Sequence, residues 1–390
     1  MKVLVSYRVM QSWRLPLFKM ISESPSIDLL VLTSKDFKGT KVVNAKPTTK
    51  INFWKKIYSF NIFLRRSSGN FCLPIAPMLL FHIIKFKPEI IIVEGISNIF
   101  NNFQCFIYAK LFNVPIIQWG LGELPNRRRG FMSKLIKNLL TFYERQSDAA
   151  IAYSTSGKEY YLKAGFPKHK VITALNVIDT NKRKEEIFSF LESNNFNSIE
   201  KVPNKRSLIY LGAIEKNKDL DYLIDLHQRL LADFPELNLE IVGDGSFRKE
   251  IENECIQENK RNIIFHGNKE GEIANILCGS SLLVLPSLGG LVFSEALIHG
   301  VPIMCGPADG SEKDFTKHQK SLLMTNKLKE DQEKWYEVAK NYLLDEKSRR
   351  SIIINGCEFI KANDINSYAG KIEDFCKFIF NDHKKHASFS

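Results

Sequence analysis

The chain has little of what marks membrane-spanning or exported proteins. It contains no uninterrupted apolar stretch of about 18 residues, which is the approximate length that a helix needs to cross a bilayer. Its first residues, Met1 and Lys2, lead directly into the strand-like segment VLVSY rather than into the apolar core of a signal peptide. We therefore expect a cytoplasmic protein without a spanning helix.

Cysteine is scarce and scattered. The seven cysteines lie far apart, their number is odd, and they form no CxxC pair and no Cys/His cluster of metal-ligand spacing. This pattern argues against a disulfide scaffold and against a structural zinc site. We expect reduced, buried thiols, and neither a metal nor another cofactor.

Acidic residues are few in the first half of the chain. Residues 1–180 contain 26 Lys and Arg against 10 Asp and Glu, whereas residues 181–390 contain 29 against 33. The net charge of +12 therefore divides into a strongly basic half and a mildly acidic half. A basic half suits nucleic acid, an anionic membrane or a phosphorylated substrate, although an ordinary soluble surface can also carry such charge. We expect no nucleic-acid partner, because no reader motif accompanies the charge.

Neither half begins with the GxGxxG pattern of a dinucleotide-binding domain. The segment EIVGDGSFRKEIE (Glu240–Glu252) contains a GxG turn between a strand and a helix, but it does not lie in the first strand–helix unit of its half. This position disfavours a nicotinamide-dependent dehydrogenase.

The chain is rich in short β-branched runs that alternate with amphipathic stretches. This alternation predicts an α/β fold with two doubly wound parallel sheets. The predicted strands are 2–7, 28–33, 89–94, 115–119, 149–153 and 171–174 in the first half, and 207–212, 237–243, 262–267, 281–286, 301–305 and 321–324 in the second. A helix is predicted after Asp219, because Leu220, Leu223, Ile224 and Leu230 share one face.

The chain is long enough for two domains, and a polar stretch between the halves marks the boundary. We place a first Rossmann-like domain at residues 1–180, a linker at 181–206 and a second Rossmann-like domain at 207–360. Residues 361–390 are predicted to form a C-terminal helix and tail that cross back to the first domain.

The most informative segment is PSLGGLVFSEALIHGVP, Pro286–Pro302. A predicted strand ends at its first residue, Gly289 and Gly290 form a loop, and a helix follows from about Val292 to His299. Such a loop can bind anions, because free backbone N–H groups and the positive end of the helix dipole face the same point. Glu295, in the first helical turn, can reach a ligand there and bind a ribose diol. An ordinary strand–turn–helix with a capping glutamate has the same pattern.

A second strand ends in glycine at YLGAIEKNKDLD, Tyr210–Asp221. The loop contains Lys216 and Lys218, and a mobile lysine charge is well suited to a diphosphate. A solvated lysine is the alternative interpretation. The final DLD triplet resembles a DxD metal motif, but Asp219 is better explained as the residue that caps the next helix.

These segments, in order, resemble the nucleotide-sugar-binding domain of family 4 (group 1) glycosyltransferases. Gly212–Asp219 resembles the GRLxxxKG loop of that family, Leu239–Gly245 its LxIVGDG turn, Ile264–Gly267 its FxG turn, and Ser281–Pro302 its segment PSxxEGFGLVxxEAxxxGxPV. Weaker similarity to the acceptor-side pattern covers Lys87–Gly95, Pro115–Gly122 and Asp148–Thr180.

The resemblance implies the GT-B architecture, in which two Rossmann-like domains flank a cleft where the reaction takes place. It also implies a retaining sugar transfer without metal, with Lys218 on the donor diphosphate and Glu295 on the ribose as the catalytic residues. The donor-binding residues it implies are Gly212, Lys216, Gly243, Gly267, Ser287, Gly289, Gly290, Leu291 and Val292.

On the acceptor and membrane side, we expect roles for Trp119, Gly120, Arg127, Arg128 and Arg129. The three arginines precede FMSKLIKNLLTFYERQ, an amphipathic segment, and basic residues beside such a helix suggest attachment to an anionic bilayer. A crossover helix packed on the first sheet is the alternative. The expected partners are a nucleotide sugar, a glycan or polyprenyl-diphosphate-linked acceptor and the anionic inner leaflet. Resemblance to envelope enzymes suggests O-antigen or capsule biosynthesis.

The chain departs from the family pattern at three positions. Ser287 stands where the first glutamate of the family is expected, Ala213 replaces an arginine, and Leu121 replaces a histidine. Two alternatives therefore stay open. One is a nucleotide-sugar 2-epimerase of the same fold, and the other is a catalytically impaired protein that binds sugar or membrane.

Overall fold

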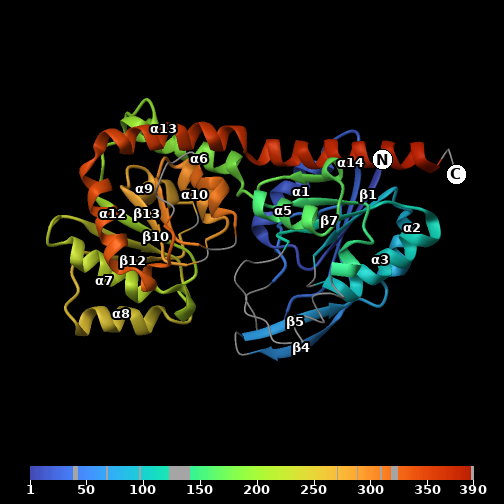
Figure 1. Cartoon of the computed structure of the whole chain (residues 1–390), viewed down its shortest axis with the longest axis horizontal. Coiled ribbons are helices and arrows are strands. Elements are labelled where there is room, and N and C mark those ends of the chain that lie inside the picture. Colours follow the sequence, from blue (N-terminus) through green and yellow to red (C-terminus); the bar gives the residue numbers. More distant parts are fainter. Residues whose placement is uncertain are drawn as a thin grey trace. The chain divides into compact units, whose positions relative to one another are not determined.

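The computed structural model describes residues 1–37, 43–66, 69–95, 98–122, 141–269, 271–287, 289–307, 310–317 and 324–387. The chain forms two compact units, one made of Met1–Leu175 with Asn366–Ser390 and the other of Asn176–Ile365 (Figure 1). Residues 181–206, where the composition suggests a linker, contain most of helix α6 (Thr180–Ser193) and belong to the second unit. Their polar composition is compatible with a helix because α6 buries only a narrow face, which includes Ile187.

The first unit is built on a seven-stranded parallel sheet of order β3-β2-β1-β6-β7-β8-β9. The strands are β1 Lys2–Tyr7, β2 Asp28–Thr33, β3 Trp54–Lys56, β6 Ile90–Glu94, β7 Ile116–Gly120, β8 Ala149–Ala152 and β9 Val171–Thr173. The six predicted strands are present. β3 and the antiparallel hairpin of β4 (Phe60–Arg66) and β5 (Gly69–Ile75) are additional.

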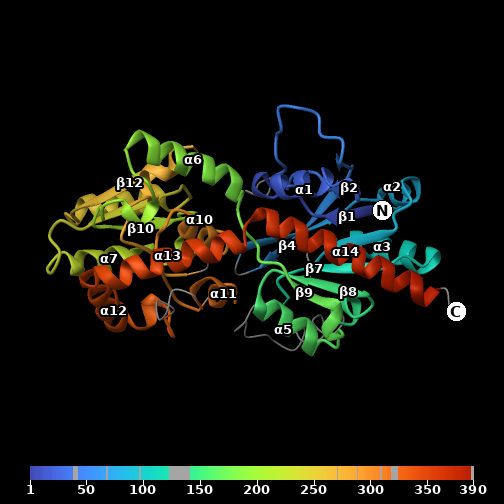
Figure 2. The same cartoon turned by 90° about the horizontal axis from the view of Figure 1, so that it is seen from above.

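Helices cover both faces of this first sheet. α2 (Leu79–Phe86) and α3 (Ile99–Phe112) pack on one face, against a core that includes Leu4 and Ile91. On the other face, α1 (Leu15–Ser22) and α14 (Ile365–Ala387) lie over the strands, and α5 (Thr155–Lys163) packs near β8 and β9 (Figures 1 and 2).

The second unit is built on a five-stranded parallel sheet of order β12-β11-β10-β13-β14. The strands are β10 Ser207–Leu211, β11 Asn238–Val242, β12 Ile263–Gly267, β13 Leu282–Leu285 and β14 Ile303–Cys305. The strand predicted at 321–324 lies mostly outside the described residues. The strand order reverses at β10 and β13, because the chain adds β11 and β12 on one side of β10 and then returns to add β13 on the other.

Two helical layers enclose this second sheet. On one face lie α7 (Leu220–Leu230), α8 (Arg248–Gln257) and α12 (Gln332–Leu344). The other layer contains α6, α9 (Ile273–Leu277), α10 (Val292–Ile298) and α13 (Glu346–Ala362), and the short α11 (Glu312–Thr316) follows β14. Short 3-10 helices span Ser12–Arg14, Lys168–Lys170, Ile199–Lys201, Lys216–Lys218 and Leu328–Glu330.

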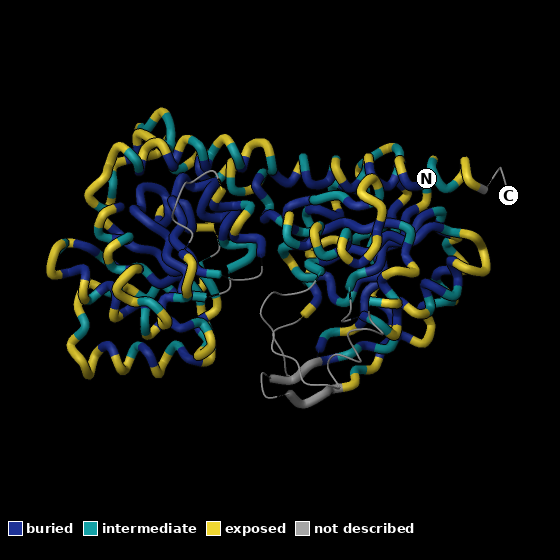
Figure 3. The backbone as a smooth tube through the Cα atoms, in the orientation of Figure 1, coloured by how far each residue is buried: buried dark blue, intermediate teal, exposed yellow. Residues whose placement is uncertain are grey.

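The hydrophobic core of each unit lies between its sheet and its helices. In Figure 3, buried residues are concentrated at the centre of each unit. The predicted face of α7 is buried, with Leu220, Leu223 and Leu230 inaccessible to solvent. The predicted α/β class with two doubly wound parallel sheets is confirmed. Within the described ranges, no helix is both long enough and apolar enough to cross a bilayer.

Candidate functional site

The glycines at the carboxyl end of the second sheet allow its loops to pack closely on one another. The amide of Gly212 donates to the carbonyl of Val242 at 3.0 Å, and that of Gly243 donates to the carbonyl of Gly267 at 2.8 Å. A Cβ atom at Gly243 would stand 1.8 Å from the carbonyl oxygen of Gly212, and one at Gly245 would meet backbone at 1.9 Å. These glycines are therefore required by the backbone packing that shapes this edge.

Lys218 and Ser287 meet where the strand order of the sheet reverses. Lys218 ends the 3-10 helix that follows β10, and Ser287 comes shortly after β13, the neighbouring strand. The hydroxyl of Ser287 donates to the carbonyl of Lys218 at 3.3 Å. Gly290 follows with a positive φ of 65°, and a Cβ atom added to it would meet nothing within 4 Å. In open α/β sheets, ligands bind in the crevice at such a reversal point.

Lys216 and Asp219, two further charged residues of the β10 loop, have different partners. Lys216 is exposed, and its ammonium group lies 3.4 Å from the carboxylate of Glu250 on α8. Asp219 is the residue before α7, as predicted, but its side chain makes no cap hydrogen bond. Its backbone is left-handed, with φ of 54°, and its carboxylate instead forms an ion pair with Lys329 at 3.1 Å.

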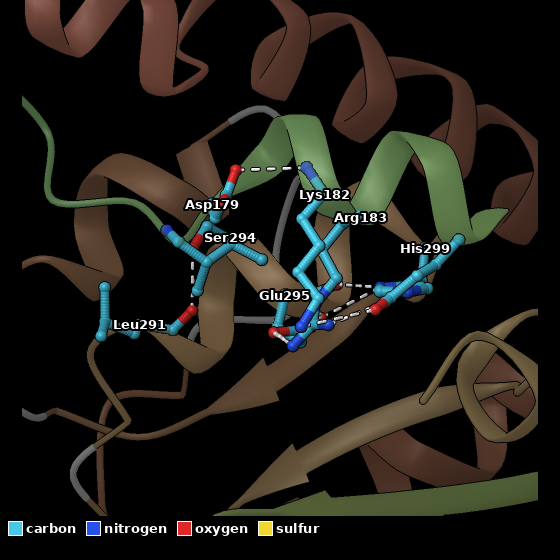
Figure 4. Close-up of polar contacts among 9 residues, drawn as sticks. Asp179, Lys182, Arg183, Leu291, Ser294, Glu295 and His299 are labelled. Carbon is cyan, nitrogen blue, oxygen red and sulfur yellow. Dashed lines mark hydrogen bonds and ion pairs between the residues drawn. The ribbon is translucent and has the colours of Figure 1, made fainter. Parts of the chain in front are cut away.

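Glu295 is buried beneath α6 and ion-paired (Figure 4). Its Oε1 lies 2.6 Å from Nε of Arg183, and Nη2 of the same arginine donates to Oε2 at 3.3 Å. Arg183 also pairs with Glu186 at 2.7 Å. Oε1 is enclosed by protein, and its close contact with Arg183 is an ion pair rather than a well-directed hydrogen bond. Arg183 therefore contacts both oxygens of the carboxylate.

The protonation of this cluster is set by burial and by Arg183. Burial raises the pKa of Glu295, while the charge and hydrogen bond of Arg183 act to lower it. His299 is fully buried, and burial lowers its pKa to about 4. Nδ1 of His299 lies 2.7 Å from the carbonyl oxygen of Glu295, whereas Nε2 has no hydrogen-bond partner among the residues that the structure describes. At neutral pH the cluster therefore holds a neutral imidazole.

The chain segment that enters α6 is fixed to α10. The amide of Ile178 donates to the hydroxyl of Ser294 at 3.2 Å, and that hydroxyl donates to the carbonyl of Leu291 at 2.8 Å. Asp179 caps α6 by accepting from the amide of Lys182 at 3.1 Å (Figure 4). Leu291 and Val292, predicted donor-binding residues, thus stand at the start of a helix that is fixed to α6.

The sequence did not predict the roles of Arg183 and His299. His299 lies one helical turn after Glu295, a spacing that places both side chains on the same face of the helix. Their proximity could therefore have been predicted from the sequence. Arg183 carried no local signal, because its contact with Glu295 spans 112 positions in the sequence. The structure brings Lys218 and Ser287 together and directs the carboxylate of Glu295 toward Arg183.

The acceptor-side residues predicted in the first unit divide into two groups. Trp119 is completely buried at the end of β7, where its ring lies 4.9 Å from the guanidinium of Arg14, and Gly120 follows it in the same strand. Trp119 therefore packs in the core at the carboxyl end of β7. Arg127, Arg128 and Arg129 lie outside the described residues. Across the residues that are described, no group of three or more His, Cys, Asp or Glu side chains is arranged to hold a metal.

Comparison with known proteins places this geometry in context. Residues 192–359 match the family model described as glycosyl transferases group 1. An uncharacterized glycosyltransferase of Methanocaldococcus jannaschii is 27% identical over 250 residues, which are 60% of this chain and 68% of that protein.

Solved structures share the fold at low sequence identity. Anabaena HepE in complex with UDP superposes with a TM-score of 0.67 at 14% identity, over 97% of this chain and 100% of that chain. A putative UDP-N-acetylglucosamine 2-epimerase from Listeria monocytogenes superposes with a TM-score of 0.62 at 12% identity, over 98% of this chain and 97% of that one. The fold alone is therefore common to a UDP-bound protein and to a putative epimerase.

Proposed function

We propose that this chain, which the family match and the curated relative show to be a glycosyltransferase, uses a nucleoside-diphosphate sugar as donor and a glycan or lipid-linked saccharide as acceptor. The observation that carries the proposal is the meeting of Lys218 and Ser287 at the strand reversal of the second sheet, with open backbone at Gly290 beside them. A diphosphate needs a cation and backbone N–H groups, and in this proposal Lys218 and the backbone at Gly289 and Gly290 supply them.

In the proposed reaction, Lys218 neutralises the charge that develops on the departing diphosphate. The bond between the anomeric carbon and the diphosphate breaks while the acceptor hydroxyl forms the new glycosidic bond on the same face. The hydroxyl proton passes to the departing diphosphate. Because the new bond forms on the face from which the diphosphate leaves, the configuration at the anomeric carbon is retained, and in this proposal no metal takes part. Glu295 is proposed to bind the ribose of the donor, and Arg183 holds its carboxylate in place.

Uridine diphosphate sugars are the first donors to test, because HepE was solved with UDP-glucose as well as with UDP. For the acceptor, we propose a polyprenyl-diphosphate or glycolipid carrier at the inner leaflet, in the biosynthesis of a cell-surface polysaccharide. The strong basic charge of the first half supports this part of the proposal.

The experiment is incubation of the purified chain with a panel of nucleotide sugars, with and without a lipid-linked acceptor. We expect nucleoside diphosphate to be released only when donor and acceptor are both present. Isomerisation of the donor sugar without acceptor would instead establish a 2-epimerase. Binding of donor without turnover in any combination would establish a catalytically impaired protein, which the substitutions at Ser287, Ala213 and Leu121 make worth testing.

Glu295→Gln and Lys218→Met test the assigned roles in the same assay. We expect each to lower kcat/KM by at least about a hundredfold, because each removes a charged group from the proposed donor site. Lys249→Met is the matched control, since Lys249 is an exposed lysine on α8. Full activity in both site variants would contradict the assignment.

A further inference from the structure

We propose that the outward faces of α2 and α3 in the first unit form a surface that binds an anionic lipid bilayer. We call this surface the α2–α3 face and define it by Phe81, Ile84, Phe100, Phe103 and Leu111 with Lys85 and Lys110. The inference rests on the lipid-linked acceptor proposed above and specifies where the chain contacts the membrane.

The α2–α3 face is apolar, although the inward sides of both helices already bury apolar residues against the sheet. Leu79 and Ile83 of α2, and Cys105 and Phe106 of α3, are buried against the sheet. The opposite sides are nevertheless hydrophobic, and Phe81 and Leu111 are 54% and 73% exposed. In α3, Phe100, Phe103 and Leu111 recur at helical spacing on the exposed side. A solvent face of a helix is normally polar, so this one is suited to a partner.

The two outward faces lie next to each other. α2 and α3 are packed together over the same side of the first sheet, as both views of the chain show (Figures 1 and 2). The ring of Phe103 lies 6.2 Å from that of Tyr143, and the neighbouring Phe142 is 60% exposed. Exposed aromatic surface therefore continues beyond α3.

The charge of this face fits an anionic partner. Neither α2 nor α3 contains an Asp or Glu, and each has a lysine in its last turn, Lys85 and Lys110 respectively. The pKa of His82 on α2 is lowered by burial and by the charges of Lys55 and Lys85, which shows that the surroundings are cationic. Aromatic and aliphatic side chains flanked by lysines are the composition that inserts about 5 to 10 Å into the boundary of an anionic bilayer.

A bilayer fits this face better than a second copy of the chain. In a two-fold symmetric contact, each face would meet itself, so lysines would approach lysines with no carboxylate on either helix to pair them. Anionic headgroups supply the missing charge, while the acyl boundary receives the phenylalanine and leucine side chains.

Flotation of the full chain with vesicles tests the proposal. Wild-type protein is expected to float with vesicles of equal parts phosphatidylglycerol and phosphatidylcholine and not with phosphatidylcholine alone. The double variant Phe81→Asp/Leu111→Asp is expected to lower the partition coefficient by about tenfold or more, because two exposed apolar groups are lost and two negative charges are added. The matched control is Ile256→Asp on α8, since Ile256 is 74% exposed in the other unit, and it should float like wild type.

A second variant separates a folding defect from a binding defect. Lys85→Glu/Lys110→Glu changes exposed positions at the ends of the two helices, and it should also reduce flotation about tenfold while its melting temperature stays at the wild-type value. Flotation of both double variants at the wild-type level, or no flotation of the wild type, would overturn the proposal. So would a dimer in solution that Phe81→Asp/Leu111→Asp converts to monomer without any effect on lipid binding.

The enzymatic proposal is tested independently by diphosphate release in the presence of acceptor. Turnover without vesicle binding would overturn the lipid surface and leave the function standing. If vesicle binding depends on the α2–α3 face but the chain turns over no nucleotide sugar, the proposed function is overturned and the lipid surface stands.

Discussion

The guanidinium of Arg183 and the carboxylate of Glu295 are in direct contact in the candidate site, at 2.6 Å. Burial alone favours the neutral acid, and Arg183 partly offsets that preference. In the proposed role, Glu295 accepts hydrogen bonds from the donor ribose, and the ionised carboxylate offers the most acceptor sites for them. We therefore propose that Arg183 is a positioning residue that holds Glu295 in place and favours its charged form.

Arg183→Met should move the acidic limb of the profile of kcat/KM against pH to higher pH, because the pKa of Glu295 rises further when its positive partner is lost. Arg183→Lys should keep part of the original profile, because lysine retains the positive charge but lacks the planar guanidinium that can contact both carboxylate oxygens. The measurement is the pH profile of diphosphate release together with the melting temperature. An acidic limb that does not move in a folded Arg183→Met variant would rule out this role.

His299 makes the stability of the second unit sensitive to acid. Its pKa is about 4 in the folded chain, below its ordinary value of about 6.5, so under acid conditions the unfolded chain takes up a proton that the folded chain does not. The folded state loses about 3 kcal/mol from this group as the pH falls from about 6.5 to about 4, and nothing above that range.

In His299→Gln, the free energy of unfolding should decline less steeply over that pH range than in the wild type. Urea denaturation at several pH values provides the comparison. If the free energy of unfolding falls equally steeply with decreasing pH in both proteins, His299 is not the group that makes the stability sensitive to acid.

Some residues of the site were predictable and others were not. Lys218, Ser287 and Glu295 could be singled out because each follows a strand that ends in a short loop. Arg183 could not be, because its partner is distant in the sequence and ordinary helix residues surround it. Trp119 was expected to serve the acceptor, yet it is completely buried, since aromatic side chains from β1 and α14 close over it.

Among the elements, the loops after β10 and β11 depend most strongly on glycine. Gly243→Ala would place a methyl group 1.8 Å from the carbonyl oxygen of Gly212, on a backbone with φ of 138°. We expect a loss of about 3 kcal/mol or more, because backbone must move and the β10 loop with Lys218 is displaced. Urea denaturation measures the loss.

Gly370→Ala is the matched control, because Gly370 lies in α14 with nothing within 4 Å of the added methyl group. Here alanine should stabilise the chain by up to about 1 kcal/mol, since helical glycine is unfavourable. Equal stability of Gly243→Ala and the wild type would contradict the close packing of the two loops.

Element types could be predicted where a periodic pattern was strong. The buried parallel strands appear as short β-branched runs, and α7 shows its buried face at helical spacing. β3 could not be found in this way, because its sequence, WKK, has no apolar run and the strand forms by pairing with the edge of β2. α6 was obscured by its polar composition, since only a narrow face meets α9 and α10.

At the scale of the whole molecule, the C-terminal helix α14 is part of the first unit although it follows the second in sequence. The hydroxyl of Tyr368 accepts from Arg14 at 2.9 Å, and Ser24 donates to Glu373 at 2.7 Å. Lys170 pairs with Asp382 at 2.9 Å. Tyr368, Ile372, Phe375, Cys376 and Ile379 are buried along this helix.

Deletion of residues 366–390 should therefore destabilise the first unit and leave the second close to its original stability. Differential scanning calorimetry is expected to show one transition moved to lower temperature and one retained. A single transition that shifts as a whole in the long deletion would contradict the assignment of α14 to one unit.

The net positive charge of the chain lies in its first half. Composition could not show that the basic first half also has an apolar outer surface, because Phe100, Phe103 and Leu111 resemble core residues when only their spacing is read. Their exposure follows from the order of layers, since the other side of α3 already fills the core.

The most direct test of the central claim is the affinity of UDP for the wild type and for Lys218→Met, measured by isothermal titration calorimetry with Lys249→Met as control. If the donor diphosphate binds where Lys218 and Ser287 meet, Lys218→Met should weaken binding about ten- to hundredfold, which corresponds to about 1.5 to 3 kcal/mol for a charge-assisted hydrogen bond. Lys249→Met should bind like the wild type. Equal affinity of Lys218→Met and the wild type for UDP would contradict a donor site at this edge of the second sheet.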